Sequence, residues 1–132
     1  MNVGDELPEQ TFPIDRLTLI RYAGASGDFN PIHWSESTAR SVGLPDVIAH
    51  GMLTMAEAIR VVTDWVGDPG AVLEYGVRFA KPVVVPEETG AQVVVAGKVT
   101  KVNDDGTAVV TLTARSGEEK VLAQAKATIR LP

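Results

Sequence analysis

Apolar residues follow a helical spacing in the middle of the chain. Between residues 49 and 66 they recur every three or four positions, which is the spacing of one helix face. The positions on this face are Met52, Met55, Ala56, Ile59, Val62, Thr63 and Val66. The pattern therefore predicts one long amphipathic helix over residues 49–66, with an apolar side that packs against another layer.

Two shorter helices are predicted before this one. The first runs from Asp15 to Gly24, because Asp15 is a favourable N-cap and apolar residues fall on one side of the segment. The second follows Ser35 and ends at Gly43, where glycine is a common helix terminator. The residues up to Phe12 are a candidate for an additional strand.

From residue 71 onward, apolar and polar residues alternate, which is the pattern of half-buried strands. The alternating runs cover residues 73–79, 91–102, 107–114 and 121–129. Polar segments containing glycine, residues 103–106 and 116–118, separate the last three runs and predict hairpin turns. An antiparallel meander beside one long helix is an α+β arrangement. Its edge strand is expected to need cover, which a second subunit can provide.

The composition suits one folded domain that spans residues 1–132. With 45% hydrophobic residues, a chain of 132 residues can bury its own core. The absence of cysteine excludes disulfides and cysteine nucleophiles, and makes a reducing cytoplasm the simplest location. The net charge of −5 argues against nucleic acid as a partner. The N-terminal residues lack a signal-peptide pattern, and no apolar run is long enough to predict a membrane span.

The segment GDFNPIHW, residues 27–34, combines an acid and a base in one short loop. Asp28 stands five positions before His33, which is one of only two histidines in the chain. Pro31 cannot donate a backbone hydrogen bond and moves Asn30 away from the helical conformation, so the loop is predicted to turn. A tight turn can direct Asp28 and His33 at one point, as general acid–base catalysis requires. Taken alone, however, such a segment is more often only a polar turn.

The second histidine, His50, directly precedes Gly51 at the start of the long helix. The first amides of a helix have no partner within the helix, and the helix dipole favours negative charge there. The Gly51 amide is therefore a candidate donor to an oxyanion, although close packing of the helix end explains the glycine equally well. A metal site on Asp28, His33 and His50 is not expected, because the sequence contains no HxH or HExxH spacing.

Three segments together resemble the MaoC-like (R)-specific enoyl thioester hydratases. They are YAGASGDFNPIH at residues 22–33, IAHGML at residues 48–53 and VRFAKPV at residues 77–83. The segment WVGDPGAV, residues 65–72, is similar to one branch of the family, the catalytic B subunit of actinobacterial (3R)-hydroxyacyl-ACP dehydratase. The resemblance covers nearly the whole chain. It implies a hotdog fold, in which an antiparallel sheet wraps around one long central helix.

The resemblance also implies an activity, the reversible syn addition of water to a trans-2-enoyl thioester. In fatty acid and mycolic acid elongation this reaction runs as dehydration of the (3R)-hydroxyacyl thioester. Asp28 and His33 would share the proton transfers, and the Gly51 amide would stabilise the thioester oxygen; no cofactor is implied. Four further residues are expected to line the site or bind substrate: Tyr22, Asn30, His50 and Met52.

The partners of the chain are also expectations from the resemblance. The thioester carrier is acyl carrier protein or coenzyme A, and Arg60, Arg78 and Lys81 are candidates for docking an acidic carrier protein. Members of this branch pair with an A-type hotdog subunit, so a heterodimer is expected, and otherwise a homodimer. Two alternatives keep the fold and change the role: an acyl thioesterase, or a non-catalytic acyl-binding subunit.

Overall fold

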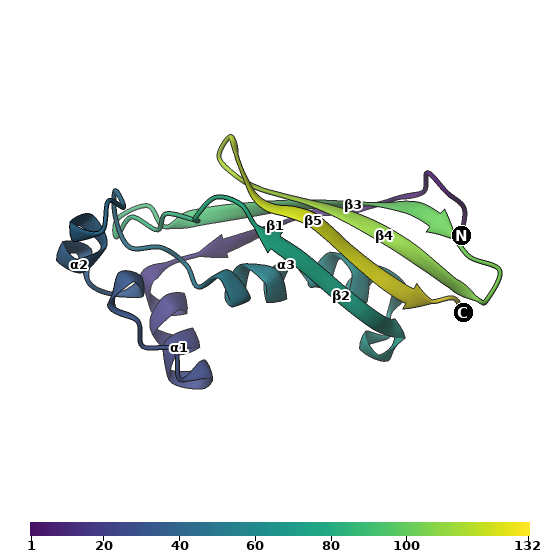
Figure 1. Ribbon diagram of the computed structural model, residues 1–132, viewed down its shortest axis with the longest axis horizontal. Helices are drawn as coiled ribbons and strands as arrows, with labels where there is room; N and C mark the ends of the chain where they lie inside the picture. The colour runs from purple at the N-terminus through teal and green to yellow at the C-terminus, as the bar shows by residue number, and fades with distance from the viewer.

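The computed structural model describes all 132 residues, and its main layer is an antiparallel sheet that curves around a helix (Figure 1). The elements are β1 (Glu6–Ile14), α1 (Arg16–Ser26), α2 (Glu36–Ser41), α3 (Gly51–Val66), β2 (Val72–Phe79), β3 (Ala91–Val102), β4 (Thr107–Ser116) and β5 (Glu119–Arg130), with short 3₁₀ helices at Pro31–His33 and Pro69–Ala71. The five strands lie in the order β1-β3-β4-β5-β2, and neighbouring strands are antiparallel. This confirms the α+β architecture of a sheet wrapped around one long helix, as well as the additional N-terminal strand.

The long helix begins at Gly51 rather than at Ala49. Ile48 and Ala49, just before the helix, are held by backbone contacts with the segment before β3. Ile48 forms an isolated antiparallel bridge with Val84, and the Ala49 amide donates to the Val83 carbonyl at 2.9 Å. These backbone contacts fix the position and direction of the helix start.

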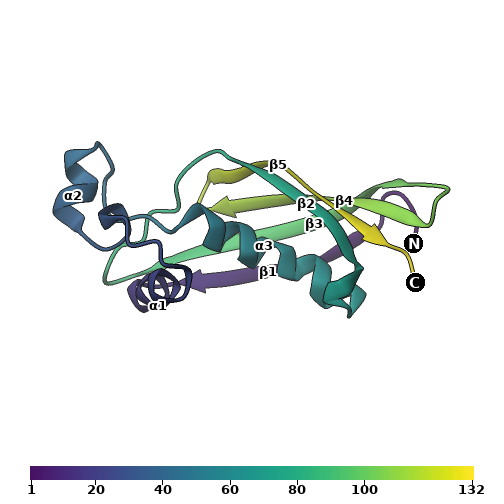
Figure 2. The ribbon, with the colours of Figure 1, turned by 60° about the horizontal axis from the view of Figure 1, so that its bottom comes forward.

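The central helix packs on the concave face of the sheet (Figure 2). Its buried residues are Leu53, Thr54, Ala58, Val61 and Val62, and they join one core with inward-facing residues of the strands. The predicted apolar stripe is confirmed only in part: Val62 is buried, and Ile59 and Val66 are half-buried against the core. Met52, the first residue of that stripe, is 57% exposed. The helix is apolar on two adjoining faces, and the sheet covers only one of them.

The sheet curves because several strands contain irregular pairing. In β5, Gln124 has a positive φ of 49° and lies between residues that keep their partners on both neighbouring strands. Such a bulge bends a strand and increases its twist. The bend lets the strands follow the helix.

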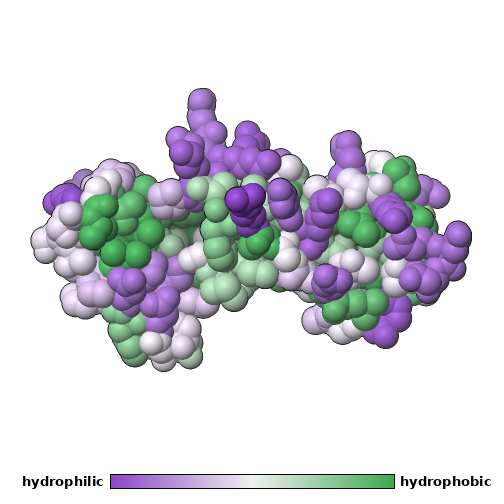
Figure 3. All heavy atoms as spheres, in the orientation of Figure 1, coloured by the Kyte–Doolittle hydropathy of each residue, from purple (hydrophilic) through white to green (hydrophobic).

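The surface is mixed in character on the face shown in Figure 3, which has the orientation of Figure 1. Hydrophilic side chains project from the β4–β5 hairpin at the top of that view, and hydrophobic atoms form separate patches toward the two ends. The exposed apolar residues near α1 are Leu17, Ile20, Phe29 and Trp34. None of the helices combines the length and the hydropathy that crossing a bilayer requires.

Candidate active site

A tightly defined turn carries Asp28 and His33, the predicted acid–base pair. Helix α1 ends at Gly27, whose φ of 78° is in the left-handed region that glycine adopts without strain. The Asn30 side chain then accepts a hydrogen bond from the Ile32 amide, and Pro31 opens the 3₁₀ helix that ends at His33. Asn30 therefore shapes the loop in this structure. The turn predicted from Pro31 and Asn30 is confirmed.

Asp28 and His33 face each other across a short gap. The Nε2 atom of His33 lies 3.9 Å from Oδ2 of Asp28, which is beyond direct hydrogen-bond distance. The His33 side chain is buried, whereas the Asp28 side chain is 52% exposed. A water molecule that bridges these two atoms would contact a carboxylate and an imidazole at once.

The tautomer of His33 follows from its backbone contact. Its Nδ1 atom lies 2.7 Å from the carbonyl oxygen of Ile48. Because a carbonyl only accepts hydrogen bonds, Nδ1 carries the hydrogen when the ring is neutral, and Nε2 carries the lone pair. The nitrogen that faces Asp28 is thus the one able to accept a proton.

The amide of Gly51 is the first in α3, and it makes no hydrogen bond within the protein. Gly51 and His33 line the same cavity of about 330 Å³. The cavity is mostly apolar, and its remaining lining residues are Ile32, Ile48, Ala49, Thr54, Phe79, Ala80, Lys81, Pro82, Val83, Val121 and Leu122. A free helix-end amide beside a proton acceptor, within an apolar cavity, is an arrangement that can stabilise a developing oxyanion.

Glycine at position 51 also has a steric reason. A Cβ atom added there would lie 3.0 Å from the Phe79 ring, closer than real side chains normally approach. Phe79 therefore packs directly over the start of α3. The close-packing explanation for the glycine holds in this structure, and it is compatible with a role for the amide.

His50 lies behind His33, away from the cavity. The two rings are stacked with centroids 3.8 Å apart, and the Tyr22 ring meets His50 edge-on at 4.7 Å. Burial lowers the pKa of the His50 imidazole, an effect that its hydrogen bond to the Asp28 carbonyl opposes. Of the predicted site residues, only His33 and Gly51 line the cavity. Contact of substrate with the others remains a prediction: Asp28, Tyr22, Asn30, His50 and Met52.

The geometry does not favour a metal ion at this cluster. Ligand atoms of Asp28, His33 and His50 all lie within 4.8 Å of one another. However, imidazole lone pairs lie in the ring planes, and the two rings are stacked at only 20°, so their lone pairs do not converge on one point. One nitrogen of each ring also already faces a backbone carbonyl. The cluster is better suited to holding and moving a proton.

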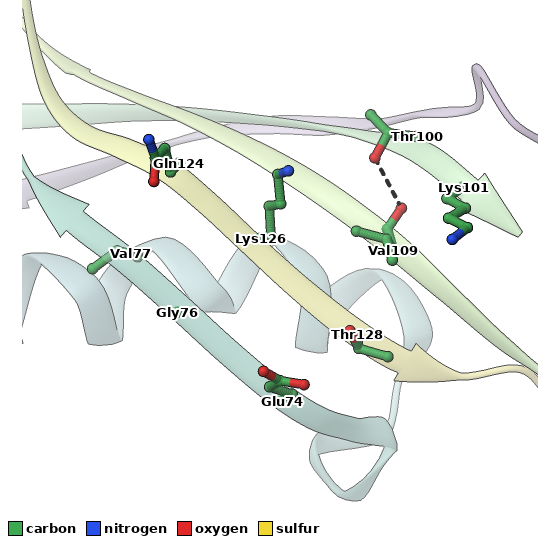
Figure 4. A pocket seen from close by; sticks show the side chains of 9 residues that line it. All are labelled: Glu74, Gly76, Val77, Thr100, Lys101, Val109, Gln124, Lys126 and Thr128. Atoms are coloured by element: carbon green, nitrogen blue, oxygen red, sulfur yellow. Dashed lines mark hydrogen bonds between the residues drawn. The ribbon is translucent and has the colours of Figure 1, made fainter. Parts of the chain in front are cut away.

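A larger hollow of about 590 Å³ lies on the outer face of the sheet (Figure 4). It is lined by Glu74, Gly76, Val77, Thr100, Lys101, Val109, Gln124, Lys126 and Thr128, from four strands. Along β5 these residues alternate with the buried Ala125 and Ala127, so they face away from the core. The hollow shares no residue with the cavity at His33, and we assign the site to that smaller cavity.

Two contributors to the site were not predicted from sequence. Ile48 acts through its backbone carbonyl, and such a role leaves no mark on the choice of side chain. Phe79 was predicted only as part of a strand and of the segment VRFAKPV, and its position over Gly51 depends on how β2 ends. Lys81, a candidate for carrier docking, does line the cavity.

Comparisons with known proteins identify relatives of the chain. It is 40% identical over 86 residues to 3-hydroxyacyl-thioester dehydratase X of Mycobacterium tuberculosis, covering 65% of this chain and 30% of that protein. A solved MaoC-like dehydratase is 42% identical with a TM-score of 0.97, covering 100% of this chain and 41% of the other. A chain in the ChsH1–ChsH2 complex from M. tuberculosis is 26% identical with a TM-score of 0.84, covering 100% of this chain and 99% of the other.

The chain spans less than half the length of the first two of these relatives. A family model described as MaoC like domain matches residues 3–118, which include the turn with Asp28 and His33 and all of α3. The match agrees with the sheet wrapped around α3 and with the segments that suggested the resemblance. This chain belongs to the family of MaoC-like domains.

Proposed function

We propose that the chain is a hydro-lyase that interconverts (3R)-hydroxyacyl and trans-2-enoyl thioesters. The observation that carries the proposal is the His33 lone pair on Nε2, which faces the Asp28 carboxylate across 3.9 Å, while the His33 side chain lines an apolar cavity. The free Gly51 amide lines that cavity as well. The names of two relatives, a dehydratase X and a MaoC-like dehydratase, support the same reaction class.

In the hydration direction, one water molecule supplies both atoms that bond to the former double bond, the oxygen at C3 and the hydrogen at C2. The water lies between Asp28 and His33, which together take one of its protons, and its oxygen forms a bond to C3 of the enoyl group. The electron pair of the double bond moves toward the thioester carbonyl, giving an enolate. The same pair of residues returns a proton to C2. Because both atoms come from one water position, they add to the same face, as syn addition requires.

The enolate oxygen is expected to accept a hydrogen bond from the Gly51 amide. This amide has no competing partner within the protein, and the N-terminal end of α3 adds the favourable field of the helix dipole. Loss of one such donor typically lowers kcat by roughly 10²–10³. The apolar walls exclude water around the developing charge and strengthen the interaction.

Hydration of crotonyl-CoA and longer enoyl thioesters tests the proposal. Asp28→Asn and His33→Ala are each expected to lower kcat by roughly 10²–10⁴ because each removes a proton-transfer group. Asp104→Asn, in the exposed β3–β4 turn, is a matched control that should retain normal turnover. Normal turnover in Asp28→Asn or His33→Ala would contradict the assigned roles. Release of free thiol without loss of the double bond would instead identify a thioesterase.

The biological setting is a further part of the proposal. We expect the chain to act in fatty acid or mycolic acid elongation, on acyl carrier protein or coenzyme A thioesters. We expect Lys81, which lines the cavity, to interact with an acidic carrier. A second hotdog subunit is the expected partner, and the similarity to a chain of the ChsH1–ChsH2 complex supports pairing of this kind. An activity assay with each carrier, with and without a candidate second subunit, separates these possibilities.

A further inference from the structure

A second buried imidazole lies directly behind the proposed acid–base pair. His50 is only 1% exposed, and its ring is stacked on that of His33 with a centroid distance of 3.8 Å and an interplanar angle of 20°. It does not line the cavity, and its ring is buried against the ring of His33. His50 is therefore expected to affect the reaction through the residues that it contacts.

The hydrogen bonds of His50 specify one neutral tautomer. Its Nε2 atom lies 3.1 Å from the backbone carbonyl oxygen of Asp28, so Nε2 carries the hydrogen and donates it. Its Nδ1 atom is buried and has no hydrogen-bond partner. A proton added to Nδ1 would create a buried charge with no acceptor, against the adjacent His33 ring. The neutral form with hydrogen on Nε2 is thus strongly favoured.

The backbone of His50 is used as well. Its carbonyl oxygen accepts hydrogen bonds from the amides of Leu53 at 3.0 Å and Thr54 at 3.2 Å, and so begins the hydrogen-bond ladder of α3. The following amide is that of Gly51. One residue therefore connects the Asp28 backbone, the His33 ring and the start of the helix, while the Tyr22 ring closes the remaining side at 4.7 Å.

We propose that His50 is a positioning residue for the hydration reaction. Its Nε2–H fixes the Asp28 backbone and its ring supports His33, so the carboxylate and the His33 Nε2 atom are kept at the 3.9 Å separation that one bridging water requires. The proposal rests on the function proposed above. It assigns His50 a purpose different from the substrate contact expected from sequence.

Two substitutions at position 50 distinguish the contribution of the hydrogen bond from that of the aromatic ring. His50→Phe keeps an aromatic ring and loses the donor, whereas His50→Gln keeps an N–H group of similar reach and loses the ring. Because small misplacements of catalytic groups are costly, His50→Phe is expected to lower kcat by roughly 10- to 100-fold. KM should change less than about threefold, since substrate contacts are untouched. His50→Gln should recover part of the loss, and Asp104→Asn serves as the exposed control.

A measurement on the unmodified protein tests the hydrogen bonds of His50 without relying on the folding of a variant or on enzyme activity. Nitrogen-15 NMR of the imidazoles should show His50 neutral, with hydrogen on Nε2, between about pH 7 and 8. An Nδ1–H tautomer, protonation within that range, or normal kcat in His50→Phe would each overturn the proposal. If wild-type protein adds no water to any enoyl thioester, the proposed function fails, and the assignment of His50 to catalytic positioning fails with it. In that case the NMR result still tests the hydrogen bonds of His50 by itself.

Discussion

At the residue scale, hydrogen-bond direction gives the two histidines different roles. His33 donates from Nδ1 to the Ile48 carbonyl, which leaves Nε2 facing Asp28 at the cavity. His50 donates from Nε2 to the Asp28 carbonyl, which leaves Nδ1 buried and unused. Sequence alone predicted that Asp28 and His33 would meet. It did not predict that the two rings donate from different nitrogen atoms, because both acceptors are backbone carbonyls whose positions depend on the folded chain.

The lowered pKa of His50 predicts a loss of stability in mild acid. Burial opposes protonation of His50 in the folded state, so its pKa lies below the ordinary value of 6.5. As the pH falls below about 6.5, the unfolded chain binds a proton at His50 that the folded chain excludes, and the free energy of unfolding decreases until the lowered pKa is reached. The groups facing His50 are His33, Asp28 and Tyr22.

Urea unfolding at about pH 7.5 and about pH 5.5 measures this loss. Wild-type protein is expected to lose more stability between these two values than His50→Phe, whose side chain does not titrate. The carboxyl groups of Asp15 and Asp105 also have lowered pKa values, but their contributions are lost only in stronger acid, near and below 3.8. An equal loss in both proteins would show that His50 is protonated as easily in the folded state as in the unfolded chain.

At the element scale, periodic segments were predicted well. The hairpin turns at residues 103–106 and 116–118 are confirmed, as is the existence of the long helix. The side of that helix facing the sheet was predicted only in part, because both adjoining faces are apolar and only the position of the sheet decides which is buried. The 3₁₀ helix at Pro31–His33 was predicted only as a turn, although its shape aims His33 at the cavity.

The contact between β2 and the start of α3 gives a prediction at this scale. Gly51→Ala places a Cβ atom 3.0 Å from the Phe79 ring, so the ring or the helix start has to move. If the helix start moves, the Gly51 amide is displaced from the oxyanion, and kcat is expected to fall by roughly 10-fold or more. Removing the ring with Phe79→Ala in the same protein should relieve the clash.

A double-mutant cycle of Gly51→Ala and Phe79→Ala on kcat/KM tests the coupling directly. The double variant is expected to be more active than the product of the two single effects implies. Circular dichroism and the thermal midpoint of each variant provide the control for folding. Strictly multiplicative effects would mean that the two residues act independently, and that the contact does not position the amide.

At the scale of the whole molecule, the two edges of the sheet differ in character. The outer strand β1 contains Pro8 and Pro13, which cannot donate to another strand. The other outer strand, β2, contains no proline and exposes the large apolar residues Leu73 and Phe79. Both outer strands carry charged side chains, but prolines, which protect a solvent-exposed edge from pairing, occur only in β1. The edge at β2 is therefore the one suited to pairing with another subunit.

The sequence predicted that an edge strand of the sheet would pair with a second subunit, but it did not indicate which strand. Which strands lie at the edges depends on the strand order β1-β3-β4-β5-β2, in which β2 crosses over to pair with β5. That order is set by contacts between segments far apart in the chain. The partly uncovered second face of α3, including exposed Met52, adds to the apolar surface that the folded chain leaves open.

Leu73→Lys is expected to weaken subunit pairing, because a lysine on an edge strand opposes the addition of another strand. Light scattering coupled to size-exclusion chromatography measures the mass of the assembly, for this chain alone and for this chain co-expressed with a candidate A-type hotdog subunit. The wild-type chain should form a two-chain assembly in at least one case, and Leu73→Lys should shift it toward single chains. Val102→Lys replaces another exposed apolar residue, at the end of β3, and should leave pairing intact. A wild-type chain that stays single under both conditions, or a Leu73→Lys variant that pairs as tightly as wild type, would rule out pairing through β2.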